Sequence, residues 1–199
     1  VKPSHLGSSI GIGVATNQDQ LKCAIDIAIE FDDKILVEHK LTDFVEVNCA
    51  VYRGVKGVVV STTEQPLSKS DFLSFEDKYS TGKMSGGGHI IPAPIGNLNG
   101  QIEEITENIY NKLGLKGVVR IDYLVDTERE KIYVNEINTV PGSLAHYLFE
   151  RKGISFGDIL DDIIEFVERE YLDKKSRVRS FSTGILDNFK GGAKSTKLK

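Results

Sequence analysis

Two neighbouring runs of strand-forming residues constrain the fold of this chain more than any other feature. Residues 117–125 and 131–137 are rich in branched and aromatic side chains, and the polar segment 126–130 separates them. Strands joined by so short a turn pair antiparallel as a hairpin. The chain is therefore expected to contain an antiparallel sheet, and side chains on these two strands are held on a rigid scaffold.

This hairpin carries polar side chains where a sheet usually keeps apolar ones. Because strand side chains alternate between faces, Arg120 and Asp122 share one face of the first strand. Glu136 and Asn138 share a face of the second strand, with Val134 in line behind them. Strand pairing can bring Asp122, Glu136 and Asn138 together, and carboxylate and amide oxygens suit Mg²⁺ beside substrate phosphates. From this motif alone, a solvated hairpin in which Arg120 neutralises the carboxylates is an equally good interpretation.

Helices and further strands are expected on both sides of the hairpin. The spacing of apolar residues predicts a helix over residues 18–31 that Thr16-Asn17 caps, a helix over residues 99–113, and a third helix that Ser155 caps. Further strands are expected over residues 1–2, 34–41, 44–51 and 57–62, and the last two are expected to pair across a turn near Arg53-Gly54. Helices interleaved with antiparallel strands indicate α+β lobes, not a doubly wound parallel sheet.

Two long loops are candidates for binding phosphate. Residues 2–13 combine small side chains, free backbone N–H groups and Lys2, which together can wrap phosphate oxygens. The order differs from that of a P-loop, and a flexible turn is the favoured interpretation of this loop taken alone. Residues 70–88 show little periodicity, and in them Lys78 and Tyr79 are either part of a lid over bound phosphates or an ordinary polar pair.

Weaker signals lie between these loops. The backbone of residues 38–41 has the character of a strand end that could read an adenine, and Glu46 could bind ribose hydroxyls, but surface charges explain both equally well. The four histidines lack the spacing of metal ligands. For His5, His39 and His89 a surface or loop role is expected.

Composition narrows the class of protein. The net charge of the whole chain is −4, although its last residues are basic. Residues 1–172 taken alone therefore carry a larger negative charge than the whole chain, which argues against a nucleic-acid-binding surface. Residues 173–199 are expected to be a basic, flexible tail. No run approaches the roughly 20 apolar residues of a membrane helix. Cys23 and Cys49 are isolated, as expected of reduced thiols in a cytoplasmic protein.

Taken in order, a set of stretches resembles the D-alanine–D-alanine ligase family of the ATP-grasp superfamily. These stretches are VKPSHLGSSIGI, KILVEHKL, FEDKY, GVVRIDYLVD and YVNEINTVPG. The resemblance runs from Val1 to about Leu172. It implies two α+β lobes with largely antiparallel sheets enclosing a nucleotide cleft, with residues 1–43 in the smaller lobe and 44–172 in the larger. It also implies that the N-terminal domain of the family is absent here.

The resemblance implies roles residue by residue. The implied nucleotide-binding residues are Lys2, Gly7, Ser8, Ser9, Glu38, His39, Lys40, Leu41, Glu46 and Lys78. The implied ligands of two Mg²⁺ ions, with Mn²⁺ as a substitute, are Asp122, Glu136 and Asn138. The implied catalytic residues are Arg120, Gly142, Lys78 and Tyr79. Of these, Arg120 and the N–H of Gly142 would face the reacting carboxylate, and Tyr79 would favour an amine nucleophile over a hydroxy acid.

The implied activity is the ATP-dependent joining of two D-alanines through an acyl phosphate, for peptidoglycan precursors of the cell wall. The expected partners are small molecules, with no nucleic acid and no membrane, and a homodimer of the full-length form is left open. The 199-residue chain alone is expected to be inactive, because the missing domain holds much of the first substrate's site.

Two positions depart from the family pattern. Leu6 stands where the family commonly has Glu, and Tyr147-Leu148 aligns with the Ser-Leu that usually meets the carboxylate of the second substrate. These departures keep open a ligase for another amine or hydroxy-acid acceptor. A catalytically silent nucleotide-binding module is a further alternative, and the presence of Arg120, Asp122, Glu136, Asn138 and Lys78 argues against it.

Overall fold

The computed structural model describes residues 1–7, 9–67 and 88–177. Three residues with predicted roles, Ser8, Lys78 and Tyr79, lie outside this range, as does the predicted tail from residue 178 onward. The predictions made for them therefore stay predictions.

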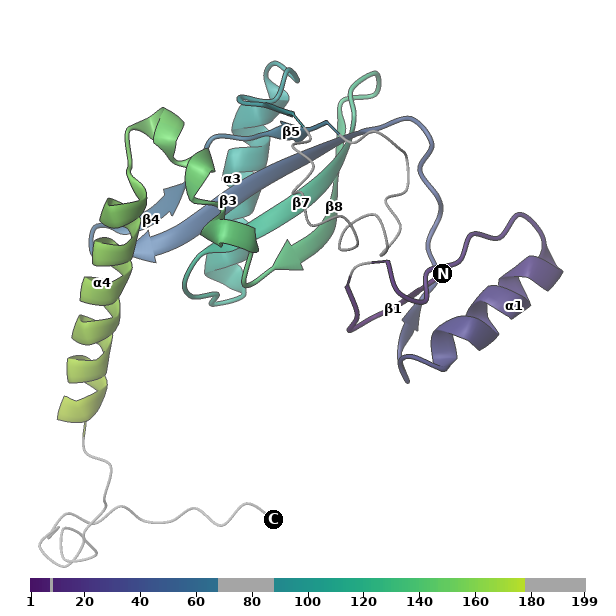
Figure 1. Cartoon of the computed structure of the whole chain (residues 1–199), viewed down its shortest axis with the longest axis horizontal. Helices are drawn as coiled ribbons and strands as arrows, with labels where there is room; N and C mark the ends of the chain where they lie inside the picture. Colours follow the sequence, from purple (N-terminus) through teal and green to yellow (C-terminus); the bar gives the residue numbers. More distant parts are fainter. Residues whose placement is uncertain (8, 68–87, 178–199) are drawn as a thin grey trace, which may run out of the picture.

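A four-stranded antiparallel sheet forms the centre of the molecule (Figure 1). Its strands are β3 (Val45–Gly54), β4 (Gly57–Val60), β7 (Val119–Asp126) and β8 (Lys131–Asn138), in the order β4-β3-β7-β8. The predicted hairpin is therefore confirmed as β7 and β8, and the predicted strand pair near residue 54 as β3 and β4.

The register of the hairpin contains one irregularity that alternation alone does not predict. Asp122 lies opposite Glu136, but Tyr123 lies opposite Val134. Strand β8 therefore has one additional residue, which bulges between Val134 and Glu136. Val134 is therefore not in line behind Glu136, and that expectation was wrong. A bulge of this kind places two residues of one strand against one of its partner and shifts the faces beyond it.

The two faces of the sheet pack against different elements. On one face, α3 (Leu98–Lys112) covers alternate residues of β3 and β7, including the fully buried Val47, Ile121 and Tyr123. Fully burying a large apolar side chain contributes about 1.5–3 kcal/mol, so this layer is the main core. Figure 1 shows α3 behind the sheet.

The opposite face is only partly covered. Two short 3-10 helices, η1 (Gly142–Leu148) and η2 (Glu150–Lys152), lead into α4 (Phe156–Ser176). They pack a second core against one end of this face; its members are Ala50, Tyr52, Val118, Ala145, Leu148, Phe149 and Ile159. The rest of the face keeps the polar residues of β7 and β8. The predicted cap is confirmed, because Ser155 and Asp158 form a capping box, but α4 continues into residues 173–176, which were expected to belong to the tail.

The contact between α4 and β3 is close at Gly54, which makes this position sensitive to substitution. The Asp162 carboxylate accepts hydrogen bonds from the backbone N–H of Val55 (3.1 Å) and the hydroxyl of Tyr52 (3.4 Å). A methyl group at Gly54 would overlap that carboxylate. We expect Gly54→Ala to lower the free energy of unfolding by about 1–3 kcal/mol, the usual cost of overpacking. Gly100→Ala in α3, where the added methyl meets nothing within 4 Å, is the matched control in urea denaturation and is expected to be neutral or stabilising.

A small unit lies to one side of the sheet (Figure 1). It contains β1 (Lys2–Pro3), β2 (Ile35–Leu36) and α1 (Gln18–Ile29), with the Asn17 side chain accepting from the N–H of Gln20 at 2.9 Å as the predicted cap. The strand predicted over residues 34–41 was too long, because β2 pairs with β1 at two positions only. A further pair, β5 (Gln65–Pro66) and β6 (His89–Ile90), flanks the undescribed segment.

Candidate active site

The polar side chains of the hairpin come together on the face of the sheet opposite α3. Arg120 lies opposite Asn138 of β8, and Asp122 lies opposite Glu136. Directly paired residues of antiparallel strands point to the same face, with Cβ atoms about 4.5–5.5 Å apart. The hairpin register therefore gathers the three predicted metal ligands and the predicted catalytic arginine into one patch.

Hydrogen bonds join the members of this patch. Arg120 donates to both oxygens of Asp122, with Nε–Oδ1 at 2.6 Å and Nη2–Oδ2 at 2.8 Å. The Asn138 amide donates to Asp122 Oδ2 at 3.0 Å and to Glu136 Oε1 at 3.2 Å. The structure thus brings the proposed ligands together and also forms the Arg–Asp pair of the alternative interpretation.

The electrostatics of Asp122 favour a bound cation. Burial raises the pKa of its carboxyl to about 6, against the opposing effect of Arg120, and the facing charge of Glu136 raises the pKa further. The hydrogen bonds from Arg120 to Asp122 in turn raise the pKa of the arginine. Two carboxylates and one amide on a single face supply the hard oxygen donors that Mg²⁺ takes, so the residues present fit that ion.

The raised pKa of Asp122 leads to a measurable expectation. A carboxyl with a higher pKa in the folded chain holds its proton more tightly there, so the stability that it contributes falls as pH rises from about 4 to about 6. Carboxyl-carbon NMR should give a midpoint near 6 for Asp122, and Mg²⁺ with ADP should lower it, because a cation favours the carboxylate. Asp126, whose pKa Arg129 lowers, is the control that Mg²⁺ should leave unchanged. An Asp122 midpoint that is the same with and without Mg²⁺ would contradict the metal assignment.

Residues after the hairpin approach the same face. Gly142 begins η1 directly after Pro141, and the following residues Ser143, Leu144 and Ala145 have left-handed backbone angles with φ between 48° and 51°. Such a conformation is costly for residues other than glycine, and it is typical of functional sites. It fixes the path of the chain beyond Gly142, whose N–H is the predicted oxyanion donor.

The two predicted substrate residues of η1 have different surroundings. Leu148 is fully buried in the second core, so its side chain packs against the sheet. The hydroxyl of Tyr147 donates to Glu64 Oε1 at 2.7 Å. Tyr147 also lines a pocket of about 550 Å³ together with His89, Ile91, Glu150 and Arg151.

The predicted nucleotide-binding residues at the start of the chain lie in the small unit. Lys2 Nζ pairs with Glu38 Oε1 at 2.7 Å, so two of these residues are in contact. Gly7 and Ser9 lie in the loop after β1, with Ser9 at a φ of 60°. His39, Lys40 and Leu41 follow β2 in irregular backbone, and Glu46 is an exposed residue of β3.

Glu64, Asn48 and His89 were not predicted to belong together. Asn48 Nδ2 donates to Glu64 Oε1 at 2.9 Å, and His89 Nδ1 lies 3.4 Å from Glu64 Oε2. Glu64 follows β4 in a polar stretch without periodicity, so nothing local marks it as buried. His89, for which a surface or loop role was expected, is half-exposed but contacts this buried carboxylate.

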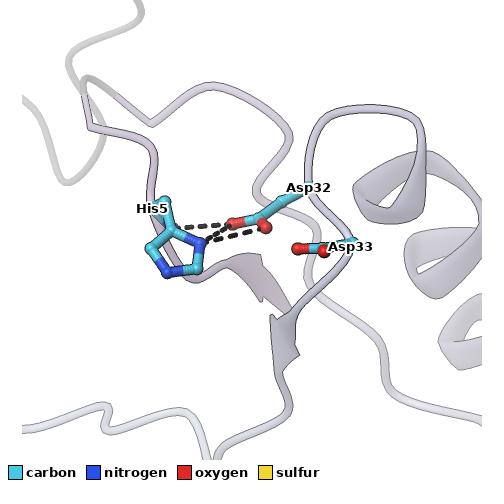
Figure 2. A group of neighbouring side chains, drawn as sticks. All are labelled: His5, Asp32 and Asp33. Atoms are coloured by element: carbon cyan, nitrogen blue, oxygen red, sulfur yellow. Dashed lines mark hydrogen bonds and ion pairs between the residues drawn. The ribbon is translucent and has the colours of Figure 1, made fainter.

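A separate cluster of His5, Asp32 and Asp33 lies in the small unit (Figure 2). Asp32 accepts hydrogen bonds from the backbone N–H of His5 (2.7 Å) and of Lys34 (3.0 Å), and its oxygens lie 3.0 and 3.1 Å from His5 Nδ1. These contacts lower the pKa of Asp32, with the Lys34 N–H as the largest cause. The cluster fastens the first loop to the end of α1, in keeping with the loop role expected for His5.

Comparison with known proteins agrees with this geometry. The family model described as D-ala D-ala ligase C-terminus matches residues 1–165. The D-alanine–D-alanine ligase of Thermosipho africanus is 41% identical over 188 residues, covering 94% of this chain and 50% of the relative. That of Borreliella afzelii is 32% identical over 185 residues, covering 89% and 50%. The chain thus spans about half the length of the curated relatives it matches.

Solved structures give the same result. The VanG D-Ala:D-Ser ligase of Enterococcus faecalis superimposes with a TM-score of 0.65 at 32% identity, covering 82% of this chain and 48% of that one. The D-alanyl-alanine synthetase A of Vibrio cholerae has a TM-score of 0.68 at 24% identity, covering 82% and 50%, and shows the fold alone.

The fold is therefore that of the ATP-grasp class, as the sequence predicted. Within that class, the chain belongs to the D-alanine–D-alanine ligase family, in its C-terminal part. In the part of the chain that the structure describes, no helix is both long enough and apolar enough to cross a bilayer.

Proposed function

We propose that this chain is the nucleotide-binding, catalytic part of an ATP-dependent ligase that joins two D-alanines through an acyl phosphate. The observation that carries the proposal is the gathering of Arg120, Asp122, Glu136 and Asn138 on one face of the β7–β8 hairpin. This arrangement occurs in a member of a family whose curated relatives are D-alanine–D-alanine ligases.

The chemistry requires activation of a poor electrophile. A carboxylate has no good leaving group, and transfer of a phosphoryl group from ATP supplies one. Asp122, Glu136 and Asn138 would hold two Mg²⁺ ions, or Mn²⁺ in their place, which when bound would neutralise phosphate charge during that transfer. In the small unit, Lys2 and the loop after it would contact the phosphates, and residues 38–41 with Glu46 would bind the adenosine.

The second step is attack of an amine on the acyl phosphate. Arg120 and the N–H of Gly142 would stabilise the oxyanion that develops, which is commonly the largest single electrostatic contribution in acyl transfer. The two hydrogen bonds from Arg120 to Asp122, which restrain the guanidinium, support this role. Lys78 and Tyr79 would close over the site as a lid that keeps water from the acyl phosphate. We place this reaction in the cytoplasm, with small molecules as its only substrates.

Phosphate release by the complete gene product tests the proposal. With ATP and Mg²⁺ supplied, D-alanine should stimulate release strongly and a D-alanyl-D-alanine product should accumulate. The panel should include L-alanine, D-lactate and D-serine, the last because a 32%-identical structure is named a D-Ala:D-Ser ligase. If another acceptor stimulated phosphate release and D-alanine did not, that other acceptor would replace D-alanine as the proposed substrate. ATP binding without stimulation by any acceptor would favour the silent nucleotide-binding module.

The 199-residue chain by itself is expected to make little or no dipeptide. Holding both reactants in attack geometry can lower the barrier by roughly 7–11 kcal/mol, and the chain spans half of its relatives. Product analysis by mass spectrometry, with the complete gene product as the control, measures this difference. Equal rates for the two proteins would contradict the expectation.

A further inference from the structure

Glu64 is a buried carboxylate that the proposed chemistry does not use. The residue is 1% exposed, and both Asn48 and Tyr147 donate to its Oε1, at 2.9 and 2.7 Å. Its Oε2 is enclosed and receives no hydrogen bond from any residue that the structure describes, although His89 Nδ1 lies 3.4 Å away. Burying a charge is costly unless it is paired and hydrogen-bonded, so the position of Glu64 calls for an explanation.

The sheet register places Glu64 in line with the proposed metal ligands. Glu136 lies opposite Asp122, Asp122 lies opposite Asn48 of β3, and Asn48 lies opposite Glu64. Because neighbouring strands are about 4.8 Å apart, Glu64 is about 10 Å from Asp122 across the sheet. Tyr147 reaches this row from η1, so its phenol lies at the Glu64 end of the row, away from β8.

The Tyr147 hydroxyl uses its one proton in the hydrogen bond to Glu64. Burial, and after it the hydrogen bond to Glu64, raise the pKa of the phenol, so the hydroxyl stays protonated and donates. While this bond is present, Tyr147 has no second proton to give to a substrate carboxylate. Tyr147 lines the neighbouring pocket, and a phenol oxygen whose proton is already donated keeps lone pairs, which are complementary to an N–H group.

We propose that Glu64 is a positioning residue for the amine acceptor. By accepting the hydrogen bond of the Tyr147 hydroxyl, Glu64 holds the phenol so that its oxygen accepts a hydrogen bond from the N–H of the incoming amine. This inference rests on the proposed function. It assigns Tyr147 a role different from that of the serine hydroxyl it aligns with, which was expected to meet the carboxylate of the second substrate. Arg151, which lines the same pocket, provides a permanently positive group for that carboxylate.

Kinetics of two variants in the complete gene product test the inference. Tyr147→Phe removes the hydroxyl, and Glu64→Gln removes the charge that orients it while keeping the shape. Each should raise the apparent KM for D-alanine by about tenfold or more, the effect of losing one hydrogen bond with a charged partner. The KM for ATP should stay within about twofold, and the double variant should be no worse than the poorer single variant, because the two residues act as one unit. An unchanged KM for D-alanine in Tyr147→Phe, or a parallel rise in the KM for ATP, would overturn the inference.

A second measurement on the 199-residue chain does not depend on ligation. With ring-carbon-labelled tyrosine, NMR near neutral pH gives the Cζ chemical shift of Tyr147, assigned by its loss in Tyr147→Phe. Glu64→Gln should change that shift, because the hydroxyl then donates to a neutral amide instead of a carboxylate. Asp162→Asn is the matched control, since Asp162 bonds Tyr52 and should leave the Tyr147 shift unchanged. A Tyr147 shift that is the same in the wild type and in Glu64→Gln would overturn the inference whatever the activity.

The two proposals fail in different ways. If no amine stimulates phosphate release by the wild-type protein, the proposed function is wrong. The role of Glu64 in positioning the amine acceptor is then wrong as well. If the wild-type protein ligates D-alanine and Tyr147→Phe keeps the wild-type KM, the proposed function stands and the inference about Glu64 is wrong.

Discussion

Replacing Asp122 by Asn and Glu136 by Gln together is expected to abolish the Mg²⁺ dependence of ATP binding while the sheet stays folded. The two carboxylates face each other across the hairpin and provide the only negative charge of the proposed ligand set. Without them an amide and neutral oxygens remain, and we expect the affinity for Mg·ATP to fall on the order of 100-fold, about 2.7 kcal/mol.

The fold should survive this double substitution because the carboxylates do not stabilise it strongly. Burial already raises the pKa of Asp122 to about 6, which means that its charged form is disfavoured in the folded chain. Glu128→Gln with Glu130→Gln removes the same charge from the exposed turn of the same hairpin and serves as the control in titration calorimetry and circular dichroism. If the Asp122/Glu136 variant unfolds and the control does not, the ion pair with Arg120 is structural, and the alternative interpretation of the hairpin is correct.

The second large effect is expected from Arg120→Met in the complete gene product. Removing a single oxyanion donor typically lowers kcat by about 10²–10³, and we expect a loss of that size with little change in the KM for ATP. The pKa of Asp122 should rise further in this variant, because the arginine is the group that lowers it.

Arg129→Met is the matched control for Arg120→Met. Arg129 also pairs with an aspartate of the hairpin, Asp126, with Nη1–Oδ2 at 2.7 Å, but it lies at the turn and its side chain is mostly exposed. We expect this variant to keep its kcat in steady-state phosphate-release assays. Equal losses in the two variants would show that the hairpin needs both ion pairs for folding and would remove the oxyanion role from Arg120.

The parts of the fold that the sequence predicted well are those decided by local pattern. Alternation over residues 117–125 and 131–137 was enough to predict the hairpin and the shared face of Arg120 and Asp122, because a short turn allows one pairing. The capping residues Asn17 and Ser155 marked the starts of two helices. Such a cap is a local signal, because its side chain accepts a hydrogen bond from a backbone N–H in the first turn of the same helix. The bulge between Val134 and Glu136 was missed because a single additional residue leaves the polar and apolar pattern almost unchanged.

The parts that the sequence could not predict depend on distant contacts. Glu64 is buried by Asn48 and by Tyr147, which follows it by 83 residues, and a polar stretch gives no sign of such partners. The strand at residues 34–41 was predicted too long because its length is set by the two residues of β1 that pair with it. The roles predicted for Lys78, Tyr79 and Ser8 remain predictions, because these residues lie outside the described part of the chain.

Titration calorimetry of the wild-type 199-residue chain with ATP, with and without Mg²⁺, tests the central claim most directly. The claim is that the β7–β8 hairpin holds a divalent cation against nucleotide phosphates. If it is correct, ATP binds weakly without the cation, and adding Mg²⁺ raises the affinity at least tenfold, or about 1.4 kcal/mol. Identical binding curves in the presence of Mg²⁺ and of EDTA, for a chain that circular dichroism shows to be folded, would contradict it.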